Sequence, residues 1–310
     1  MTHPLYLAVD SGGTKSRWIA LSKNGCIIDS FVNRGMASVR PGMLPTTEIA
    51  QEAAKHFGVS PAGIYFSLGG PNVDEIRSAM SAAFPNVPFV LEREASGDLV
   101  FSLRSFLKCD AVVMVGTGIT AIGFWQDGRH YAEGWGPLFA DFGSGGGIGF
   151  RAVQRFLREI DNLEPSKDML PLFAAQLDGL DVAFFQNRMA LKNRINALTR
   201  RELAALAPEV AKLASSGNQT AAEIIGECAR KIAEVVAAVT PPDGKCLAMG
   251  GLMKLGPSFV SQCADALLGL NAHCRFAYDE KLSLERLASI RVLMEAGVKI
   301  NEDIWNKVIK

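Results

Sequence analysis

The residues best suited to chemistry in this chain form the run Asp10-Ser11-Gly12-Gly13-Thr14-Lys15, which follows the apolar segment Leu5-Tyr6-Leu7-Ala8-Val9. Two glycines let a backbone approach an anion closely, and Thr14 and Lys15 add a hydroxyl and a positive charge. Asp10 stands at the end of the expected strand, where its carboxylate can bind hydrated magnesium. The same Asp-Ser-Gly-Gly pattern is also typical of an ordinary hairpin turn. The run therefore predicts either a phosphate-binding turn or a plain connection between strands.

The elements expected around this run alternate between strand and helix. The expected strands are residues 5–9, 18–21, 26–32, 64–68 and 88–91. The expected helices are residues 46–55, capped by Thr46 or Thr47, then 74–84 and 95–107. This alternation predicts one α/β unit in the first third of the chain.

The pattern of the opening strands begins again at Ala111. A buried strand at 111–115 is followed by the turn Gly116-Thr117-Gly118 and a second strand at 120–125. A phosphate-type turn between the first two strands of each half indicates either an internal duplication in a two-lobed nucleotide binder or a chance repetition. The remaining expected elements are a mostly helical stretch at 157–238, a strand at 246–249 leading into Gly250-Gly251, and helices at 284–296 and 302–308.

Composition limits the classes of function. The chain has 310 residues, of which 48% are hydrophobic, as expected for a folded enzyme. With 32 basic and 32 acidic residues the formal charge is zero, which argues against nucleic acid or an anionic membrane as a partner held by bulk electrostatics. The six cysteines are widely spaced, and no apolar run approaches the length of a membrane span. We therefore expect a soluble cytoplasmic protein.

Three glycine motifs occur in a fixed order, namely Asp10-x-Gly-Gly-Thr14, Gly116-Thr117-Gly118 and Gly250-Gly251. Together they resemble the two phosphate segments and the adenosine segment of the actin, Hsp70 and sugar-kinase ATPase superfamily. Residues 133–145, Glu-Gly-Trp-Gly-Pro-Leu-Phe-Ala-Asp-Phe-Gly-Ser-Gly, are similar to a stretch of the N-acetylglucosamine kinases and the wider BadF/BadG/BcrA/BcrD ATPase family. The resemblance covers most of residues 5–255.

This resemblance implies an α/β fold of two ribonuclease H-like, actin-like ATPase lobes, with mixed sheets flanked by helices, that close on ATP and a sugar. The first lobe would comprise residues 1–108, joined by the C-terminal helix at about 290–310. The second would comprise residues 109–289, with a helical insertion at about 157–238. Members of the family commonly form homodimers through the helical part of the second lobe, so a homodimer is expected here as well.

The resemblance also implies the residues of an ATP site. The γ-phosphoryl group would be held by two sets of residues, Gly12, Gly13, Thr14 and Lys15 from the first lobe and Gly116, Thr117 and Gly118 from the second. Amides and hydroxyls placed in this way neutralise a transferring phosphoryl group. Mg²⁺ would bind near Asp10. Adenosine would lie against Gly250, Gly251 and Ala214.

The sugar side departs from the family pattern. Sugar kinases of this family carry an Asp, after the fourth strand, that acts as general base toward the sugar hydroxyl. Here the segment is Glu92-Arg93-Glu94-Ala95-Ser96-Gly97-Asp98, which puts Glu94 at that position with a side chain one methylene longer. Glu94 can act as the base in an adjusted pocket, or Asp98 or Asp141 can replace it, or no sugar base is present. Without a catalytic role, Glu94 would be a solvated acid at a helix N-terminus.

Other sugar-side positions have changed or persist. A family Asn that binds the sugar falls near Val39, and a family Ser becomes Leu68, so two polar partners are lost. A site without these partners discriminates against the original sugar, which indicates a substrate different from plain N-acetylglucosamine. The family's Gly134, Trp135 and Asp141 remain and would bind the substrate. Without that role, Trp135 would be a core residue and Asp141 a turn residue.

These observations predict a magnesium- and ATP-dependent kinase for a hydroxyl of an amino sugar or related carbohydrate. Glu94 would deprotonate the hydroxyl while the two turns hold the phosphoryl group. The alternative is a non-kinase nucleotide-binding ATPase or regulator of the BadF/BadG type. Its activator form needs cysteines placed to hold an iron–sulfur cluster, and the scattered cysteines argue against it.

Overall fold

The computed structural model describes residues 4–38, 42–94, 97–126, 128–136, 139–177, 180–182, 185–270 and 273–310. Val39, Ala95, Ser96, Pro137 and Leu138 therefore lie outside the described residues. The chain forms two compact units, Met1–Lys108 with Asp279–Lys310, and Cys109–Tyr278. It enters the C-terminal part of the first unit at Asp279, earlier in the sequence than the expected residue 290.

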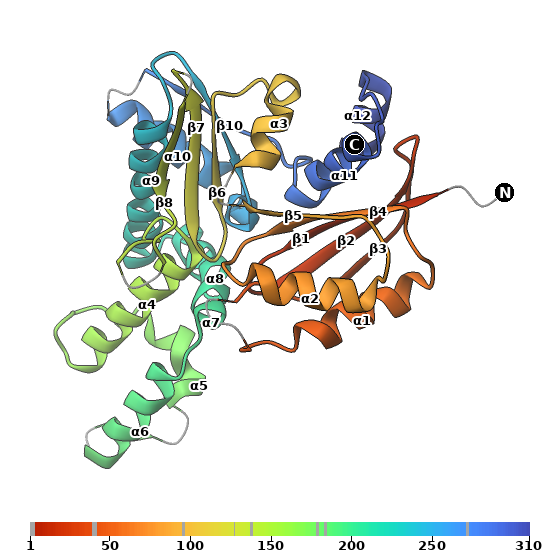
Figure 1. Ribbon diagram of the computed structural model, residues 1–310. Helices are drawn as coiled ribbons and strands as arrows, with labels where there is room; N and C mark the ends of the chain where they lie inside the picture. The colour runs from red at the N-terminus through yellow and green to blue at the C-terminus, as the bar shows by residue number, and fades with distance from the viewer. Residues whose placement is uncertain are drawn as a thin grey trace. The chain divides into compact units, whose positions relative to one another are not determined.

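The first unit contains a mixed five-stranded sheet in the order β3-β2-β1-β4-β5 (Figure 1). β1, β2 and β3 form an antiparallel meander, and β4 and β5 run parallel to β1. The carboxyl ends of β1, β4 and β5 therefore meet at one edge, where Ser11, Leu68 and Arg93 are in register. The strands are β1 (Leu5–Ser11), β2 (Lys15–Ser22), β3 (Ile27–Arg34), β4 (Gly63–Leu68) and β5 (Phe89–Arg93).

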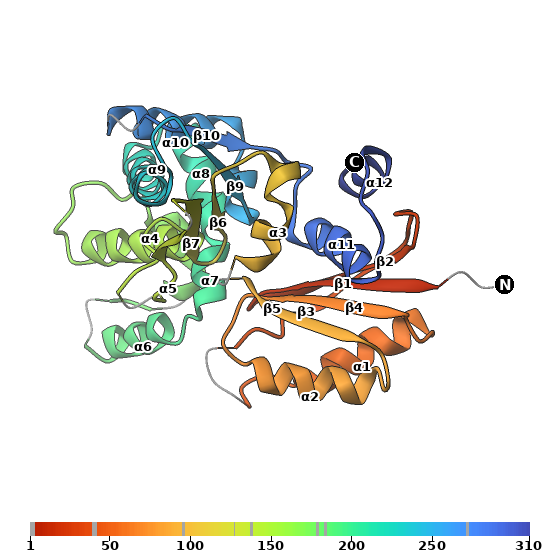
Figure 2. The ribbon, with the colours of Figure 1, turned by 45° about the horizontal axis from the view of Figure 1, so that its top comes forward.

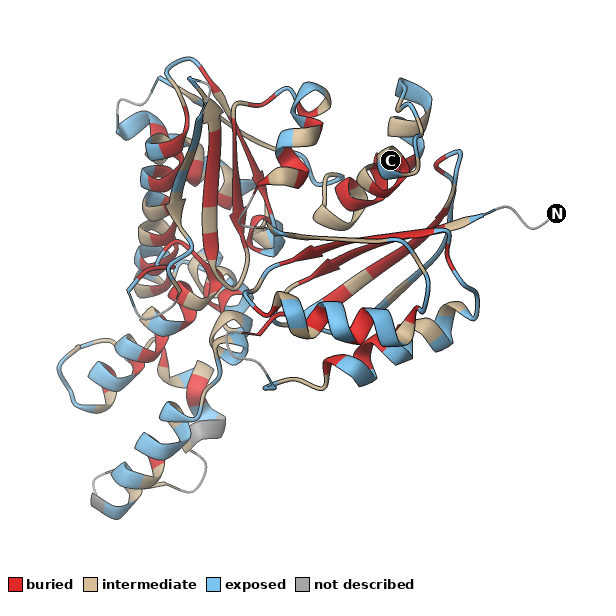
Figure 3. Ribbon diagram, viewed as in Figure 1, coloured by how far each residue is buried: buried red, intermediate tan, exposed pale blue. Residues whose placement is uncertain are grey.

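Helices cover both faces of this sheet, as Figure 2 shows. α1 (Thr46–Phe57) and α2 (Val73–Ala83) pack together on one face, and α11 (Leu284–Glu295) lies against β1 and β4 on the other. α3 (Asp98–Leu107) and α12 (Glu302–Ile309) pack against α11. Because both faces are covered, the central strands are buried over nearly their whole length and only the edge strand β3 is largely exposed (Figure 3).

The predicted cap of the first helix is wrong. The residue before α1 is Pro45, and no side chain caps the helix. The hydroxyl of Thr46 instead donates a hydrogen bond to Glu75 Oε1 at 2.8 Å. The Thr46 hydroxyl therefore binds a residue of α2 instead of capping α1, as the local sequence pattern predicts.

The core of the first unit lies between the sheet and α1 and α2. Trp18 is fully buried, and its ring meets Phe66 edge to face at a centroid distance of 6.1 Å. The indole N–H donates to Asn33 Oδ1 at 3.0 Å, which satisfies the one polar group of the ring. This packing holds β2 and β4 on either side of β1, the strand that carries Asp10.

The second unit repeats the topology of the first. Its five strands are ordered β10-β9-β6-β7-β8. β6, β7 and β8 form an antiparallel meander, β9 runs parallel to β6, and β10 runs parallel to β9. The expected duplication is therefore confirmed at the level of the sheets, and β10 was not predicted. The strands are β6 (Ala111–Val115), β7 (Ile119–Trp125), β8 (Gly128–Glu133), β9 (Lys245–Met249) and β10 (Arg275–Tyr278).

The helical part of this unit begins at Gly145, before the expected residue 157. The first turns of α4 contain Gly145, Gly146, Gly147 and Gly149, which weaken a helical pattern in sequence. Their backbones are packed so closely that a Cβ on Gly149 would overlap the carbonyl oxygen of Leu203. The glycines therefore serve close packing, a requirement that local propensity does not reveal.

The long helix α9 lies against β6, β7 and β8, and α10 packs beside it. The second core, which is larger than the first, fills the space between these elements. No helix of the described residues is both long and apolar enough to cross a membrane. The helices are α4 (Gly145–Ile160), η2 (Leu170–Phe173), α5 (Ala174–Leu177), α6 (Phe185–Asn196), α7 (Arg200–Ala205), α8 (Ala207–Ser215), α9 (Gln219–Val239), η3 (Gly251–Leu255) and α10 (Pro257–Gly269).

Gly226 in α9 gives a direct test of this packing. A Cβ at Gly226 would meet nothing within 4 Å, so Gly226→Ala is expected to raise the free energy of unfolding by about 0.5–1 kcal/mol. Gly149→Ala in α4 is the matched control and is expected to destabilise the protein, because its Cβ would overlap Leu203. Denaturant unfolding measures both effects, and a stabilising Gly149→Ala would contradict the packing described.

Candidate active site

The Asp10–Lys15 run forms the hairpin that joins β1 to β2. The Gly12 N–H donates to Lys15 O at 3.1 Å, and the Ala37 N–H donates to Gly12 O at 3.2 Å. Beneath the turn lies Gly35, where a Cβ would overlap Gly12 O. The turn therefore rests on the backbone of residues 35–37, while a Cβ on Gly12 itself would meet nothing within 4 Å.

Two buried serines hold the turn from inside. The hydroxyls of Ser11 and Ser16 are 2.7 Å apart, and the Met36 N–H donates to Ser11 Oγ at 3.0 Å. Ser16 Oγ donates in turn to Arg34 O at 3.0 Å. This buried network preorganises the hairpin, as a backbone cradle for phosphate requires.

Glu94 lies beside this turn, at the end of β5. A Cβ on Gly69 would stand 2.8 Å from Glu94 Oε2, 3.5 Å from Ser11 O and 3.6 Å from Gly12 Cα. The Glu94 carboxylate and the first phosphate-type turn therefore both border Gly69. Burial raises the pKa of Glu94 to about 7, which is suited to proton transfer near neutral pH.

Asp10 lies in the same neighbourhood and is buried. Its carboxylate is 3.5 Å from the guanidinium of Arg17, which also approaches Glu285 at 3.8 Å. Burial, followed by repulsion from Glu94 and Glu285, raises the pKa of Asp10 well above its ordinary value. Asp10 and Glu285 thus share Arg17, and Glu94 lies close enough to Asp10 to repel its charge.

Arg17 and Glu285 were not singled out from the sequence. Arg17 lies opposite Asp10 in the β1–β2 hairpin. The position of the turn in the sequence sets this pairing, so counting residues from the turn could have identified Arg17. Glu285 belongs to the first turn of α11. It approaches Asp10 only because the end of the chain packs back onto β1, and no local pattern contains that information.

The residues around Asp10 fit a nucleotide-bound magnesium ion. Mg²⁺ is usually held by one or two carboxylates together with phosphate oxygens and water. Asp10 supplies a carboxylate whose negative charge is opposed by neighbouring acids, a repulsion that a divalent cation relieves. Among the described residues no group of three or more His, Cys, Asp or Glu side chains is placed to hold a metal ion by itself.

Asp98, the alternative base of the same segment, occupies a different environment. It is the first residue of α3. Burial and the neighbouring Glu92 raise the pKa of the Tyr65 hydroxyl, and the charge of Asp98 adds to this effect. Tyr65 donates a hydrogen bond to Glu92, which also pairs with Arg291 at 3.6 Å. Glu92 therefore serves the contact with α11, Asp98 acts on Tyr65, and Glu94 is the carboxylate of the segment that lies nearest the turn.

In the second unit, Gly116-Thr117-Gly118 forms the corresponding turn between β6 and β7. The first amides of α4 support it, because the Gly145 N–H donates to Gly116 O at 2.9 Å and the Gly146 N–H donates to Thr117 O at 3.1 Å. Ser144 caps α4 by accepting the Gly147 N–H at 3.1 Å. The helix terminus thus holds the carbonyls of the turn inward.

Asp141 lies directly beside this second turn. Its Oδ1 accepts the Ile119 N–H at 2.9 Å, and its Oδ2 forms an ion pair with Arg200. The Asp141 N–H donates to Glu133 Oε2 at 3.0 Å. A φ of 66° at Asp141 turns the chain so that carboxylate and amide reach these separate partners.

Trp135 is not a core residue, because 85% of it is exposed. The preceding Gly134 has a φ of 82°, and a Cβ there would stand 3.1 Å from Thr120 Oγ1. Because Gly134 has no side chain, the loop after β8 can pass close to Thr120. The interpretation of Trp135 as a buried packing residue is wrong, and an exposed indole remains available to stack on a ligand.

The segment expected to contact adenosine is also in the second unit. Gly250 has a φ of 106°, and a Cβ there would overlap Val115 O, so the close approach of β9 to β6 accounts for this glycine. A Cβ on Gly251, where η3 begins, would meet nothing within 4 Å. Ala214 lies in α8, which packs against η3, and its own side chain is partly buried against the second core.

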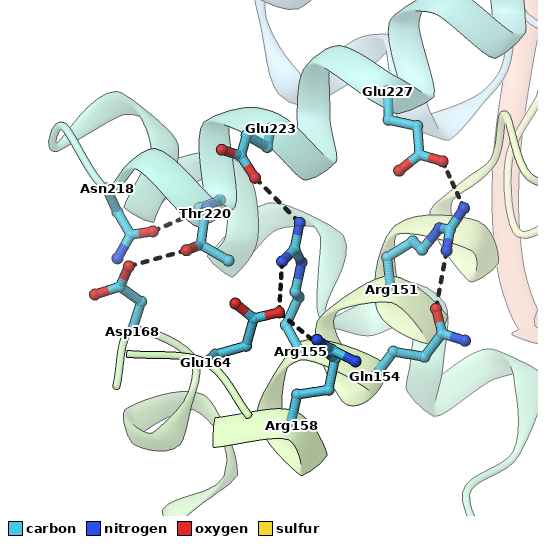
Figure 4. Close-up of polar contacts among 11 residues, drawn as sticks. Arg151, Gln154, Arg155, Arg158, Glu164, Asp168, Asn218, Thr220, Glu223 and Glu227 are labelled. Carbon is cyan, nitrogen blue, oxygen red and sulfur yellow. Dashed lines mark hydrogen bonds and ion pairs between the residues drawn. The ribbon is translucent and has the colours of Figure 1, made fainter. Parts of the chain in front are cut away.

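A surface groove of about 600 Å³ lies elsewhere, between α4 and α9. Figure 4 shows that its arginines already have carboxylate partners: Arg151 pairs with Glu227, and Arg155 and Arg158 share Glu164. Their positive charge is therefore neutralised within the chain. This groove contains none of the glycine turns and does not have the features of a phosphate site.

The fold is that of the sugar kinases and actin-like ATPases. Over 94% of this chain and 99% of the other, it superposes on a proposed N-acetylglucosamine kinase from Chromobacterium violaceum, with a TM-score of 0.69 and 19% identity. The corresponding protein of Porphyromonas gingivalis gives 0.67 with 16% identity over 95% and 100% of the chains. A ROK family glucokinase of Streptomyces griseus, solved with glucose and AMPPNP, gives 0.56 with 14% identity over 94% and 99%.

The chain belongs to the BadF/BadG/BcrA/BcrD ATPase family, whose model matches residues 7–258. Among curated proteins it is similar to the N-acetyl-D-glucosamine kinase of Dictyostelium discoideum, with 23% identity over 202 residues. That alignment covers 57% of this chain and 61% of the relative, so it spans less than two thirds of the relative's length.

Proposed function

We propose that this protein is an ATP-dependent kinase that phosphorylates a hydroxyl of an amino sugar or related carbohydrate. The observation that carries this proposal is the Glu94 carboxylate, which lies beside the first phosphate-type turn and has a pKa of about 7. A general base poised near neutral pH next to a phosphate cradle suits transfer to an alcohol. Membership of the ATPase family and the sugar-kinase fold support the same function.

In this mechanism the first unit supplies the base and part of the phosphate site. Glu94 accepts the proton of the attacking hydroxyl. The backbone of Gly12 and Gly13, with Thr14 and Lys15, binds phosphoryl oxygens in a turn that the Ser11–Ser16 network preorganises. A magnesium ion bound with the nucleotide would be held by Asp10 and would neutralise phosphate charge there.

The second unit supplies the remaining contacts. The backbone of Gly116, Thr117 and Gly118 binds phosphate, and adenosine lies along Gly250 and Gly251 with α8, which carries Ala214, packed against this segment. The carbohydrate contacts Gly134, the exposed Trp135 and Asp141. Leu68, at the position of the family's Ser, is fully buried in the core of the first unit, so the preference for a sugar other than plain N-acetylglucosamine rests on the changed residue types alone.

The alternative of a redox-enzyme activator is not favoured. Cluster-binding cysteines must act as thiolates. Burial raises the pKa of Cys109 to about 11 and that of Cys263 to about 12. Both thiols are buried, as are Cys228 and Cys246, and of the six cysteines only Cys26 is exposed at the surface.

A coupled ADP-release assay over a panel of amino sugars, N-acylated sugars and plain hexoses tests the proposed function. We expect at least one sugar to raise ATP turnover well above the sugar-free rate, and removal of Mg²⁺ to abolish it. Size-exclusion chromatography with light scattering tests the proposed homodimer. If ATP binds but no sugar raises turnover, the kinase proposal fails and a non-kinase ATPase is left.

A further inference from the structure

Arg200 reaches the second phosphate-type turn from a distant part of the sequence. It is the first residue of α7, whose start is set by a capping box between Thr199 and Glu202. α7 packs along α4, and the Arg200 guanidinium pairs with Asp141 Oδ2. A Cβ on Gly118 would overlap Arg200 Nη2, so the guanidinium lies directly against the turn.

The donors of this guanidinium are mostly unused. A guanidinium carries five N–H donors, and in the described part of the chain its hydrogen-bonded partner is Asp141, through Nη2. Its Nε is buried and has no acceptor among the described residues. The side chain is nevertheless 33% exposed. A buried donor without a partner is rare in folded proteins and needs an explanation, for which a bound ligand is one candidate.

The charges around the turn indicate an anion as that ligand. The Asp141 carboxylate faces Gly118, with its oxygens 3.0 and 3.1 Å from the position of a Cβ there, and Glu133 accepts the Asp141 N–H. Two carboxylates beside a phosphate-type turn would repel a nucleotide. Arg200 offsets one of these two negative charges, and its guanidinium matches phosphate oxygens in geometry as well as in charge.

The turn is open on its other side. A Cβ on Gly116 would meet nothing within 4 Å, whereas Gly118 is enclosed by Arg200 and Asp141. A phosphate placed against the Gly116 and Thr117 backbone would therefore be bordered by the guanidinium at Gly118.

We propose that Arg200 binds the β- or γ-phosphoryl oxygens of ATP at the Gly116–Gly118 turn, and that Asp141 positions its guanidinium. This inference rests on the proposed function as an ATP-dependent kinase. It assigns to α7 a nucleotide-binding residue that lies outside the three glycine motifs. It also gives Asp141 a task in addition to the proposed contact with the sugar.

Binding of AMP, ADP and ATP tests this role, because only ADP and ATP carry the phosphates that Arg200 would contact. Calorimetry with the magnesium nucleotides is expected to show that Arg200→Gln weakens ADP and ATP binding by roughly ten- to hundredfold and leaves AMP binding unchanged. Arg200→Lys keeps the positive charge but loses the planar guanidinium that can donate two parallel hydrogen bonds. Its affinities for ADP and ATP should therefore lie between those of the wild type and of Arg200→Gln. Arg201→Gln, which removes an exposed neighbouring arginine of the same helix, is the matched control and should bind like wild type.

Arg200→Gln leaves the Asp141 charge buried without its partner, which can unfold the unit. The double variant Asp141→Asn with Arg200→Gln removes both charges and should show the same selective loss of ADP and ATP binding. Equal weakening of all three nucleotides, or no weakening of ATP, would overturn the assignment of Arg200. If ATP binding depends on Arg200 but the wild-type protein phosphorylates no sugar, the proposed kinase function fails while the assignment of Arg200 stands.

Discussion

Glu94→Gln is expected to lower kcat by roughly 10²- to 10⁴-fold while the protein still binds ATP. The amide fills almost the same volume beside the first phosphate-type turn but cannot accept the proton of a sugar hydroxyl. Single-turnover kinetics and ATP calorimetry on the same preparation separate the two effects. Because the loss falls on the chemical step, KM for ATP is expected to stay close to its wild-type value.

The pH profile gives an independent measure of this role. Burial raises the pKa of Glu94 from 4.5 to about 7, so at lower pH the carboxyl group carries a proton and cannot act as a base. Wild-type kcat is therefore expected to rise with pH up to about 7 and then to level off. The residual activity of Glu94→Gln should lack this rise.

The same pKa predicts a change in stability with pH. Because the folded pKa of Glu94 lies above its unfolded value, protonation favours the folded state, and this contribution is lost as pH rises from 4.5 to about 7. Above that range the wild type carries the cost of a buried charge, at most about 3 kcal/mol. Glu94→Gln is therefore expected to be more stable than wild type near about pH 8, and this advantage should vanish in acid.

Glu92→Gln is the matched control, since it removes a carboxylate from the same strand that serves Tyr65 and Arg291. It is expected to retain turnover and the pH profile of the wild type. If Glu94→Gln turned over sugar at the wild-type rate, Glu94 would not be the base, and Asp98, Asp141 or no base at all would be left.

Gly35→Ala is expected to have the second large effect. A Cβ at Gly35 would overlap Gly12 O and would stand 2.7 Å from both Gly13 C and Thr14 N. These contacts are with backbone, so the turn itself must move, at a cost of roughly 1–3 kcal/mol. Because the displaced backbone is the proposed phosphate cradle, ATP affinity and kcat are both expected to fall by roughly tenfold or more.

Gly63→Ala is the control for this substitution. It lies in β4 of the same unit, where a Cβ would stand 3.7 Å from the Tyr6 ring, an ordinary contact. Its effect on ATP affinity is expected to be negligible. If Gly35→Ala lowered the free energy of unfolding but left ATP binding intact, the Asp10–Lys15 turn would not be the phosphate site.

The strands were the most predictable part of the fold. The segment 111–115 agrees with β6 at both ends, and 5–9 and 246–249 fall within β1 and β9. Each is a continuous apolar run bounded by a polar residue or glycine, a pattern that buried strands produce locally. The order of the glycine turns also predicted the repeated topology, because a turn joining two short strands is itself a local feature.

The errors arose where local signals were absent or overridden. The start of α4 was missed because its glycines serve tight packing against Leu203. α10 and β10 were not predicted, since the apolar residues of α10 are weakly periodic and β10 has only four residues. The cap at Thr46 was wrong because Glu75, far away in sequence, binds its hydroxyl.

For the candidate site, the sequence by itself determined the residue types and the order of the turns: Asp10–Lys15, Gly116–Gly118 and Gly250-Gly251. It also placed Glu94 at the end of a strand. Only the tertiary structure decided that Glu94 is buried enough to have a pKa of about 7, that Glu285 approaches Asp10 and that Arg200 lies against Gly118. The physical reason is that protonation and charge pairing depend on burial and on neighbours in space, which packing brings together from distant parts of the chain.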